Sequence, residues 1–139
     1  MSDDATQEIN ATPGWVREMG ITILTATADE VTCEWEISQK HLQPYGIVHG
    51  GVHCGVVETL ASLGAAAAAR PRGQRVVGLE NHTSFIRAVR AGKLHGKATP
   101  LTRGRTTQVW EASIRDEQEQ LVAQGRVRLL CIDEARAIG

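Results

Sequence analysis

The stretch GGVHCGVVETLASLGAAAAA, residues 50–69, decides the fold of this 139-residue chain. Apolar residues recur in it every three or four positions: Val52, Val56, Leu60, Leu63 and Ala67. This spacing is typical of one face of an α-helix. It predicts an amphipathic helix of about 19 residues and ~28 Å, which Pro71 ends in the Arg-Pro-Arg-Gly segment that follows.

Strand-like segments lie on both sides of this helix. Before it, apolar and polar residues alternate over 31–37, and residues 21–27 look like the hairpin partner. After it come four further runs, near 75–87, 93–102, 105–115 and 120–132. The links between them are too short for βαβ crossovers, so the strands pair antiparallel. The sequence therefore predicts an α+β domain, an antiparallel sheet with the helix laid against one face.

Composition and local signals set the domain limits. With 42% apolar and 22% charged residues, the chain fits one globular domain at 13–139 behind a polar tail at 1–12. Thr12-Pro13 has the pattern of an N-cap with proline in the first turn, and Gly20 that of a stop. We therefore expect a short helix over 13–19.

The sequence also excludes several classes of protein. The best candidate for a membrane span, 52–69, is mostly alanine and glycine and carries His53 and Glu58, so no membrane segment is expected. The acidic, polar first ten residues lack the pattern of a secretory signal, which favours a cytoplasmic protein. The three scattered cysteines suggest neither a disulfide framework nor a CxxC metal or redox site.

Basic residues gather in the second half of the chain. Residues 1–69 carry a formal charge of −7 and residues 70–139 one of +6. Between 70 and 105, nine lysines and arginines stand against Glu80 alone. A small phosphorylated ligand fits this stretch better than nucleic acid, because five aromatic residues in the whole chain offer little base stacking. The alternative is that these arginines simply occupy the wet face of alternating strands.

Glu58 conflicts with the pattern of an ordinary amphipathic helix. At 100° per residue it projects nearly opposite the apolar arc, yet its neighbours are small and it is the only charged residue between His53 and Arg70. Gly55 and Gly64 each cost a helix roughly 1 kcal/mol relative to alanine, so something approaches closely. We therefore expect a second cover on this face, most simply a copy of the same chain.

Burial makes Glu58 the candidate for chemistry. A buried carboxylate without a cationic partner in the helix costs several kcal/mol, which packing alone does not justify. The alternative is an ordinary exposed helix glutamate. Ser62, one turn further on the same side, could hold a water against the carboxylate, or be a small packing residue.

The segment HLQPYGIVHGGVH, residues 41–53, leads into the helix. Gly50 and Gly51 let backbone come near a ligand, and the first helical N–H groups have no intrahelical partners. They can donate to an oxygen that acquires negative charge, which is the design of an oxyanion hole. His49 and His53 suggest a metal site, but the HExxH glutamate and a third ligand are missing, so no metal is expected.

Four features combine at characteristic spacings: Gln43, the His49-Gly50-Gly51 turn, Glu58 and Ser62. This combination resembles the hotdog-fold acyl-CoA thioesterases, especially the branch with 4-hydroxybenzoyl-CoA, 1,4-dihydroxy-2-naphthoyl-CoA and phenylacetic-acid-type thioesterases. The likeness extends over about residues 15–132 and includes GRTTQVWE at 104–111. It implies a long central helix wrapped by a curved antiparallel sheet of five to six strands. It also implies homodimers with the active site at the interface, and homotetramers.

The resemblance implies hydrolysis of an aromatic acyl-CoA to free acid and coenzyme A, with no cofactor besides the coenzyme A of the substrate. Glu58 would be the nucleophile or the general base, and the Gly50 N–H would polarise the thioester carbonyl. Gln43 and Ser62 would position the carbonyl or the water, and the imidazole of His49 would brace the turn. Gln43 and Gly50 of one chain would face Glu58 and Ser62 of the other.

The same resemblance assigns the basic stretch to the coenzyme A phosphates. Their expected ligands are Arg87, Arg105, Thr106 and Thr107. The threonine pair departs from the residues that relatives carry after Gly-Arg. Further candidates for the lining of the substrate site are Asn81, His82 and Phe85.

Two other classes of function stay open. One is a hotdog protein that binds or senses acyl-CoA without cleaving it, which the presence of Glu58 disfavours. The other is a hydratase or dehydratase of the same broad fold. That chemistry would need an Asp-His pair in a setting that this sequence does not offer.

Overall fold

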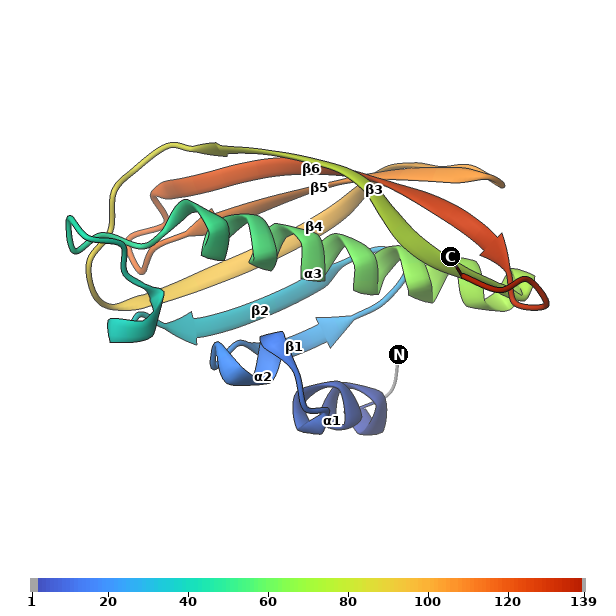
Figure 1. The fold of residues 1–139 in the computed structure, drawn as a ribbon, viewed down its shortest axis with the longest axis horizontal. Coiled ribbons are helices and arrows are strands. Elements are labelled where there is room, and N and C mark those ends of the chain that lie inside the picture. The colour runs from blue at the N-terminus through green and yellow to red at the C-terminus, as the bar shows by residue number, and fades with distance from the viewer. Residues whose placement is uncertain (1–2, 139) are drawn as a thin grey trace.

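Six antiparallel strands form one curved sheet around a single long helix (Figure 1). The structure is a computed structural model that describes residues 3–138. The strands are β1 (Thr22–Ala26), β2 (Val31–Glu36), β3 (Gln74–Phe85), β4 (Lys93–Arg103), β5 (Thr107–Arg115) and β6 (Leu121–Asp133). They lie in the order β1-β2-β4-β5-β6-β3, and the long helix is α3 (Gly50–Ala69). The predicted α+β architecture is confirmed, with strand ends within a few residues of those expected.

The core lies between α3 and the concave face of the sheet. Val56 and Leu60 are fully buried there, as the helical spacing predicts, and so is Val57, which that spacing did not include. Leu63 and Ala67 are only partly buried. Trp110 of β5 presses on the helix at Gly64, where a Cβ would come within 2.4 Å of the indole. Glycine at this position is therefore what allows the sheet to approach α3 so closely.

A buried polar pair on β5 ties the sheet to the helix. The Gln108 amide donates to the backbone oxygen of Ala65 at 3.1 Å and accepts from the Trp110 indole N–H at 2.8 Å. Both side chains are nearly inaccessible to solvent. Because each polar atom in the pair has a partner, burial costs little here. The Gln and Trp of GRTTQVWE therefore serve the packing of α3.

The N-terminal segment differs from the prediction. Within the expected polar tail, whose residues 1 and 2 lie outside the described part, Asp3–Ala11 forms helix α1. Asn10 fixes α1 to the sheet, since its amide exchanges two hydrogen bonds with the Ile23 backbone at 2.8 and 2.9 Å. The short second helix, α2 (Trp15–Glu18), starts later than predicted.

The N-cap expected at Thr12 is wrong. Its hydroxyl donates to the Glu8 oxygen at 2.7 Å, so it extends the end of α1 instead of beginning α2. Gly14 is the N-cap of α2, with φ of 143°, a conformation that favours glycine. The following Trp15 lies on Gly55 of α3, where a Cβ would come within 2.3 Å of the ring. The close approach predicted at Gly55 is thus made by Trp15 of the same chain.

Among residues 3–138, one stretch, Gly50–Arg72, is long and apolar enough to cross a membrane by length and composition alone. The 3-10 helix η2 (Arg70–Arg72) forms its last turn. In the most apolar part of this stretch, half of the residues are buried inside the fold, because the sheet wraps around α3. The apolar character of this stretch is therefore used in the core.

Candidate active site

The Glu58 carboxylate lies in the middle of α3, against the edge strand β3. The Asn81 amide of β3 donates to its Oε1 at 3.1 Å, and the Ser62 hydroxyl donates to its Oε2 at 3.4 Å. A Cβ at Gly78 would come within 2.4 Å of Oε2, so a larger residue there would displace the carboxylate. Glu58 takes part in none of the ion pairs of the described residues. The half-buried carboxylate is thus held by two neutral donors.

Asn81 is oriented by a second hydrogen bond network. The Thr83 hydroxyl donates to Asn81 Oδ1 at 2.6 Å, which turns the amide nitrogen toward α3. That nitrogen also donates to the backbone oxygen of Cys54 at 3.0 Å. Sequence reasoning missed Thr83. The available signal was alternation, since Asn81, Thr83 and Phe85 share one face of β3 and two of them are polar where a core face would be apolar.

The N-terminus of α3 presents a free backbone donor. His49 is the N-cap, and its Nδ1 accepts from the Gly51 N–H at 2.7 Å, so the imidazole braces the turn. The Val52 N–H donates to the His49 oxygen at 2.9 Å. The Gly50 N–H has no acceptor among residues 3–138. A Cβ at Gly50 would come within 2.7 Å of the Phe85 ring, so a larger residue there would push the ring or the start of α3 aside.

Gly50 and Gln43 line one cavity of about 300 Å³. The amide oxygen of Gln43 accepts from the Tyr45 N–H in the preceding turn. This contact fixes the side chain and leaves its nitrogen as a donor. Phe85 and Arg87 belong to the same cavity, together with the side chain of His53 and several aliphatic residues. The cavity therefore offers an N–H and an amide donor in mostly apolar surroundings.

His53 is a cavity residue that sequence reasoning considered only as a metal ligand. It is 4% exposed, and burial lowers its pKa to about 4, so the ring is neutral near pH 7. No group of three or more histidine, cysteine, aspartate or glutamate side chains in the described chain could hold a metal ion. The missed signal was the helical period, which puts His53 on the core side with Val56 and Leu60.

Within one chain the two halves of the expected catalytic set stay apart. Gly50 and Glu58 are separated by eight residues of α3, about 12 Å along the axis. A carbonyl oxygen bound by the Gly50 N–H therefore lies beyond the reach of the Glu58 carboxylate of the same chain. Gln43 lies with Gly50, and Ser62 lies with Glu58.

The expected phosphate ligands also lie far apart. Arg87 follows the C-terminal end of β3, next to the Gly50 cavity. Residues 105–107 lie in the β4–β5 turn and the start of β5, near the other end of β3, where Gln74 donates to the Arg105 oxygen at 3.0 Å. The strand between them spans twelve residues, roughly 40 Å.

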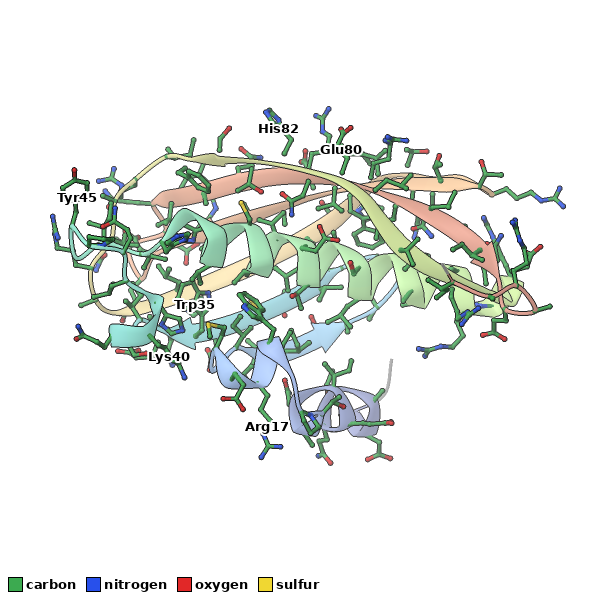
Figure 2. All side chains as sticks on the ribbon, viewed as in Figure 1. Arg17, Trp35, Lys40, Tyr45, Glu80 and His82 are labelled. Atoms are coloured by element: carbon green, nitrogen blue, oxygen red, sulfur yellow. The ribbon has the colours of Figure 1, made fainter. Side chains whose placement is uncertain are left out.

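His82 does not lie with the other site residues. Successive side chains of a strand point to opposite faces, and Asn81 faces α3. Figure 2 shows His82 and Glu80 on the outer side of the sheet, away from α3. His82 instead borders a shallow outer depression with Glu111 and Arg126. Within one chain, His82 is therefore separated from Asn81 and Phe85, with which it was predicted to line the site.

Comparisons with known proteins identify the family and agree with the fold. Residues 45–123 match the profile of a family described as the thioesterase superfamily. The chain is 37% identical over 130 residues to the Mycobacterium tuberculosis protein Rv1847, with 92% of this chain and 93% of the relative covered. It is 34% identical over 113 residues to the 1,4-dihydroxy-2-naphthoyl-CoA hydrolase of Listeria monocytogenes, covering 81% and 91%. The crystal structure of thioesterase HI1161 from Haemophilus influenzae has a TM-score of 0.89 at 29% identity, covering 100% and 96%.

Proposed function

The chain belongs to the thioesterase superfamily and has its hotdog fold, and on that premise we propose that it hydrolyses an aromatic acyl-CoA thioester to free acid and coenzyme A. One observation carries the proposal. The Glu58 carboxylate is held between Asn81 and Ser62 and forms no ion pair with any of residues 3–138, so it is available as a base or nucleophile. The aromatic acyl group is supported by the name of the Listeria relative and by the Phe85 ring on the cavity wall.

The reaction uses the free donor at the start of α3. When the thioester carbonyl is attacked, negative charge develops on its oxygen, and the Gly50 N–H and the Gln43 amide donate to it. As a general base, Glu58 takes a proton from water while the water oxygen bonds to the carbonyl carbon. As a nucleophile, it forms an anhydride that water then cleaves. In both routes the C–S bond breaks and the thiolate of coenzyme A leaves.

We propose that each active site is built from two chains. The separation of Gly50 and Glu58 along one helix supports this, because both must lie within about 3 Å of the same thioester group. A twofold axis between two antiparallel α3 helices places residue 50 of each beside residue 58 of the other. Strand β3 supports such a pairing, since it is long and lies at an edge of the sheet.

The same axis accounts for the basic residues. This twofold axis makes the β3 strands of the two copies antiparallel. The end of one β3 that leads to Arg87 then lies beside the Gln74 end of the other. Arg105, Thr106 and Thr107 of the second copy then approach Arg87 of the first, although the single chain keeps them apart. We assign this combined group to the phosphates of coenzyme A. We also expect two dimers to form a homotetramer, as the resemblance implies.

Release of thiol from a panel of acyl-CoA esters tests the function. The wild-type protein should release coenzyme A from benzoyl-type esters, and Glu58→Gln should reduce kcat by at least about 10³-fold while the ester still binds. Glu80→Gln is the matched control, because Glu80 lies on the outer face, where it forms an ion pair with Arg128 at 3.7 Å. Binding without turnover by the wild-type protein would favour a non-catalytic acyl-CoA sensor. Full turnover by Glu58→Gln would remove Glu58 from the mechanism.

A further inference from the structure

A further cavity, of about 310 Å³, lies between the N-terminal helices and α3. Its wall is largely hydrocarbon and comes from residues 9–16 together with two side chains of α3. The lining residues are Ile9, Thr12, Pro13, Gly14, Trp15, Val16, Thr59 and Leu63. We call this space the N-terminal cavity. It shares no residue with the cavity at Gly50, so it is a separate apolar space in the same chain.

The N-terminal cavity adjoins the proposed catalytic groups. Its two wall residues on α3, Thr59 and Leu63, directly follow Glu58 and Ser62 in the chain. Successive residues of an α-helix are 100° apart, so one such step around α3 leads from the catalytic side chains to the cavity wall. A group bound in this cavity is therefore close to a carbonyl that Glu58 attacks.

The proposed phosphate ligands put coenzyme A on the other side of α3. Arg87 and Arg105 lie near the two ends of β3, the strand that packs over the Glu58 carboxylate. Figure 1 shows β3 above α3, and α1 and α2 below it. The sulfur and the acyl carbon of a thioester leave the carbonyl carbon in different directions. With coenzyme A along β3, the acyl group points toward α1 and α2, where the N-terminal cavity lies.

The side chains of this cavity offer few partners for a polar group. Its two hydroxyls, those of Thr12 and Thr59, each donate to the backbone oxygen four residues earlier at 2.7 Å. The remaining polar side-chain group in the lining is the Trp15 indole N–H. A hydroxyl group bound here loses its hydration for mostly hydrocarbon contacts, which is unfavourable, whereas a methyl group gains from the same transfer.

Resting on the thioesterase function proposed above, we propose that the N-terminal cavity binds the acyl group and favours hydrocarbon substituents over hydroxyl groups. The preferred substrates are then acyl-CoA esters whose acyl group is unsubstituted or carries alkyl groups. Ile9 and Leu63 are specificity-determining residues, and Ile9 lies before the stretch 45–123 that matches the thioesterase family. The N-terminal helices thereby select the substrate, apart from the catalytic turn.

Pairs of uncleavable ligands that differ only in methyl against hydroxyl test this preference without turnover. Methyl- and hydroxyphenacyl-CoA, substituted at ring position 2, 3 or 4, carry a CH₂ between carbonyl and sulfur, and calorimetry gives the Kd of each. At one position, the wild-type protein should bind the methyl ligand at least about tenfold more tightly than its hydroxyl counterpart. Ile9→Asn and Leu63→Asn each add an amide to the cavity wall and should reduce this ratio by at least about threefold.

Leu101→Asn is the matched control, because it makes the same change at an exposed leucine of β4 outside the cavity, and it should keep the wild-type ratio. Three results overturn the inference even if acyl-CoA esters are hydrolysed. One is that no methyl ligand binds more tightly than its hydroxyl counterpart. The others are a wild-type ratio that survives in Ile9→Asn or Leu63→Asn, and a ratio that Leu101→Asn reduces equally.

The same measurements separate this inference from the proposed function. A ratio that depends on Ile9 and Leu63, together with no thiol release from any ester, overturns the hydrolysis and keeps the binding site. If the two asparagine variants do not fold, nuclear Overhauser contacts in the wild-type complex decide. The ligand methyl group should contact the methyl groups of Ile9 and Leu63. The lack of both contacts, or contacts confined to the cavity at Gly50, overturns the proposal.

Discussion

Asn81 on the edge strand β3 donates its side-chain N–H to the carboxylate of Glu58 on α3 across 3.1 Å. This bond joins the one charged group in the middle of the core helix to the strand that could pair with a second copy. Thr83 orients the amide, and Gly78 makes room for the carboxylate oxygen. The position of the proposed base therefore depends on how β3 lies over α3.

Replacing Asn81 by alanine should lower kcat by about 10- to 100-fold with little change in KM, because the carboxylate loses a donor that orients it. Thr83→Val should have a smaller effect in the same direction, since it only releases the amide. Steady-state kinetics of thiol release gives both values. Equal kcat in all three proteins would show that this network does not position Glu58.

Gly78→Ala should move the carboxylate, because a Cβ at this position comes within 2.4 Å of Glu58 Oε2. We expect a loss of at least about tenfold in kcat with the fold retained, as a 1 Å displacement of a reacting group has a large effect. Ser84→Ala, on the outer face of the same strand, is the control and should behave as wild type. The idea is wrong if Gly78→Ala also keeps full activity.

Two inactive variants should restore activity when mixed, if the site is shared. Gly50→Ala places a Cβ within 2.7 Å of the Phe85 ring and should displace the N–H donor, whereas Glu58→Gln removes the base. Refolded together in equal amounts, they form heterodimers with one intact site each, so about a quarter of wild-type activity returns. Activity of the mixture that merely equals the mean of the two variants would place both residues in a site within one chain.

Arg87→Ala should raise KM for acyl-CoA with little change in kcat, because the exposed guanidinium would contact coenzyme A away from the reacting carbonyl. Arg90→Ala is a useful comparison, since that side chain donates to the Tyr45 oxygen at 2.7 Å and lies outside the cavity lining. The KM and kcat of the two variants for acyl-CoA can be measured and compared over a range of salt concentrations. An effect of Arg87→Ala confined to kcat would contradict the phosphate assignment.

Acid should destabilise the fold through His53. Burial lowers its pKa to about 4, below the usual 6.5, so between these values the unfolded chain binds a proton that the folded one does not. Stability therefore falls as the pH drops from about 6.5 toward 4, by about 2–3 kcal/mol at pH 4.5.

Urea unfolding at pH 7.5 and 4.5 measures this loss. His53→Gln should lose less stability on acidification than the wild type, by roughly the same 2–3 kcal/mol. The control, His82→Gln on the outer face, should lose as much as the wild type. An identical loss in all three proteins would show that His53 does not titrate in this way.

Much of the fold could be predicted because its signals are local. The period of 3.6 in α3 and the alternation of the strands are set by residues near one another in sequence, and the structure follows both. Glu58 and Ser62, four residues apart on one helix, had to lie on the same side, and they do. The N-cap expected at Thr12 failed because its hydroxyl found a competing acceptor in the preceding helix.

The remaining features depend on distant contacts, which no spacing in the chain encodes. The sequence by itself determined the helix, the antiparallel sheet and the identity of the acid at its centre, because backbone geometry repeats over a few residues. Only the tertiary structure decided that Gly78 and Thr83 lie against this acid, that the buried Nδ1 of His53 has no partner among residues 3–138, and that His82 lies on the outer face. Each of these depends on how a strand and a helix pack, and that packing is fixed by the whole core rather than by neighbours along the chain.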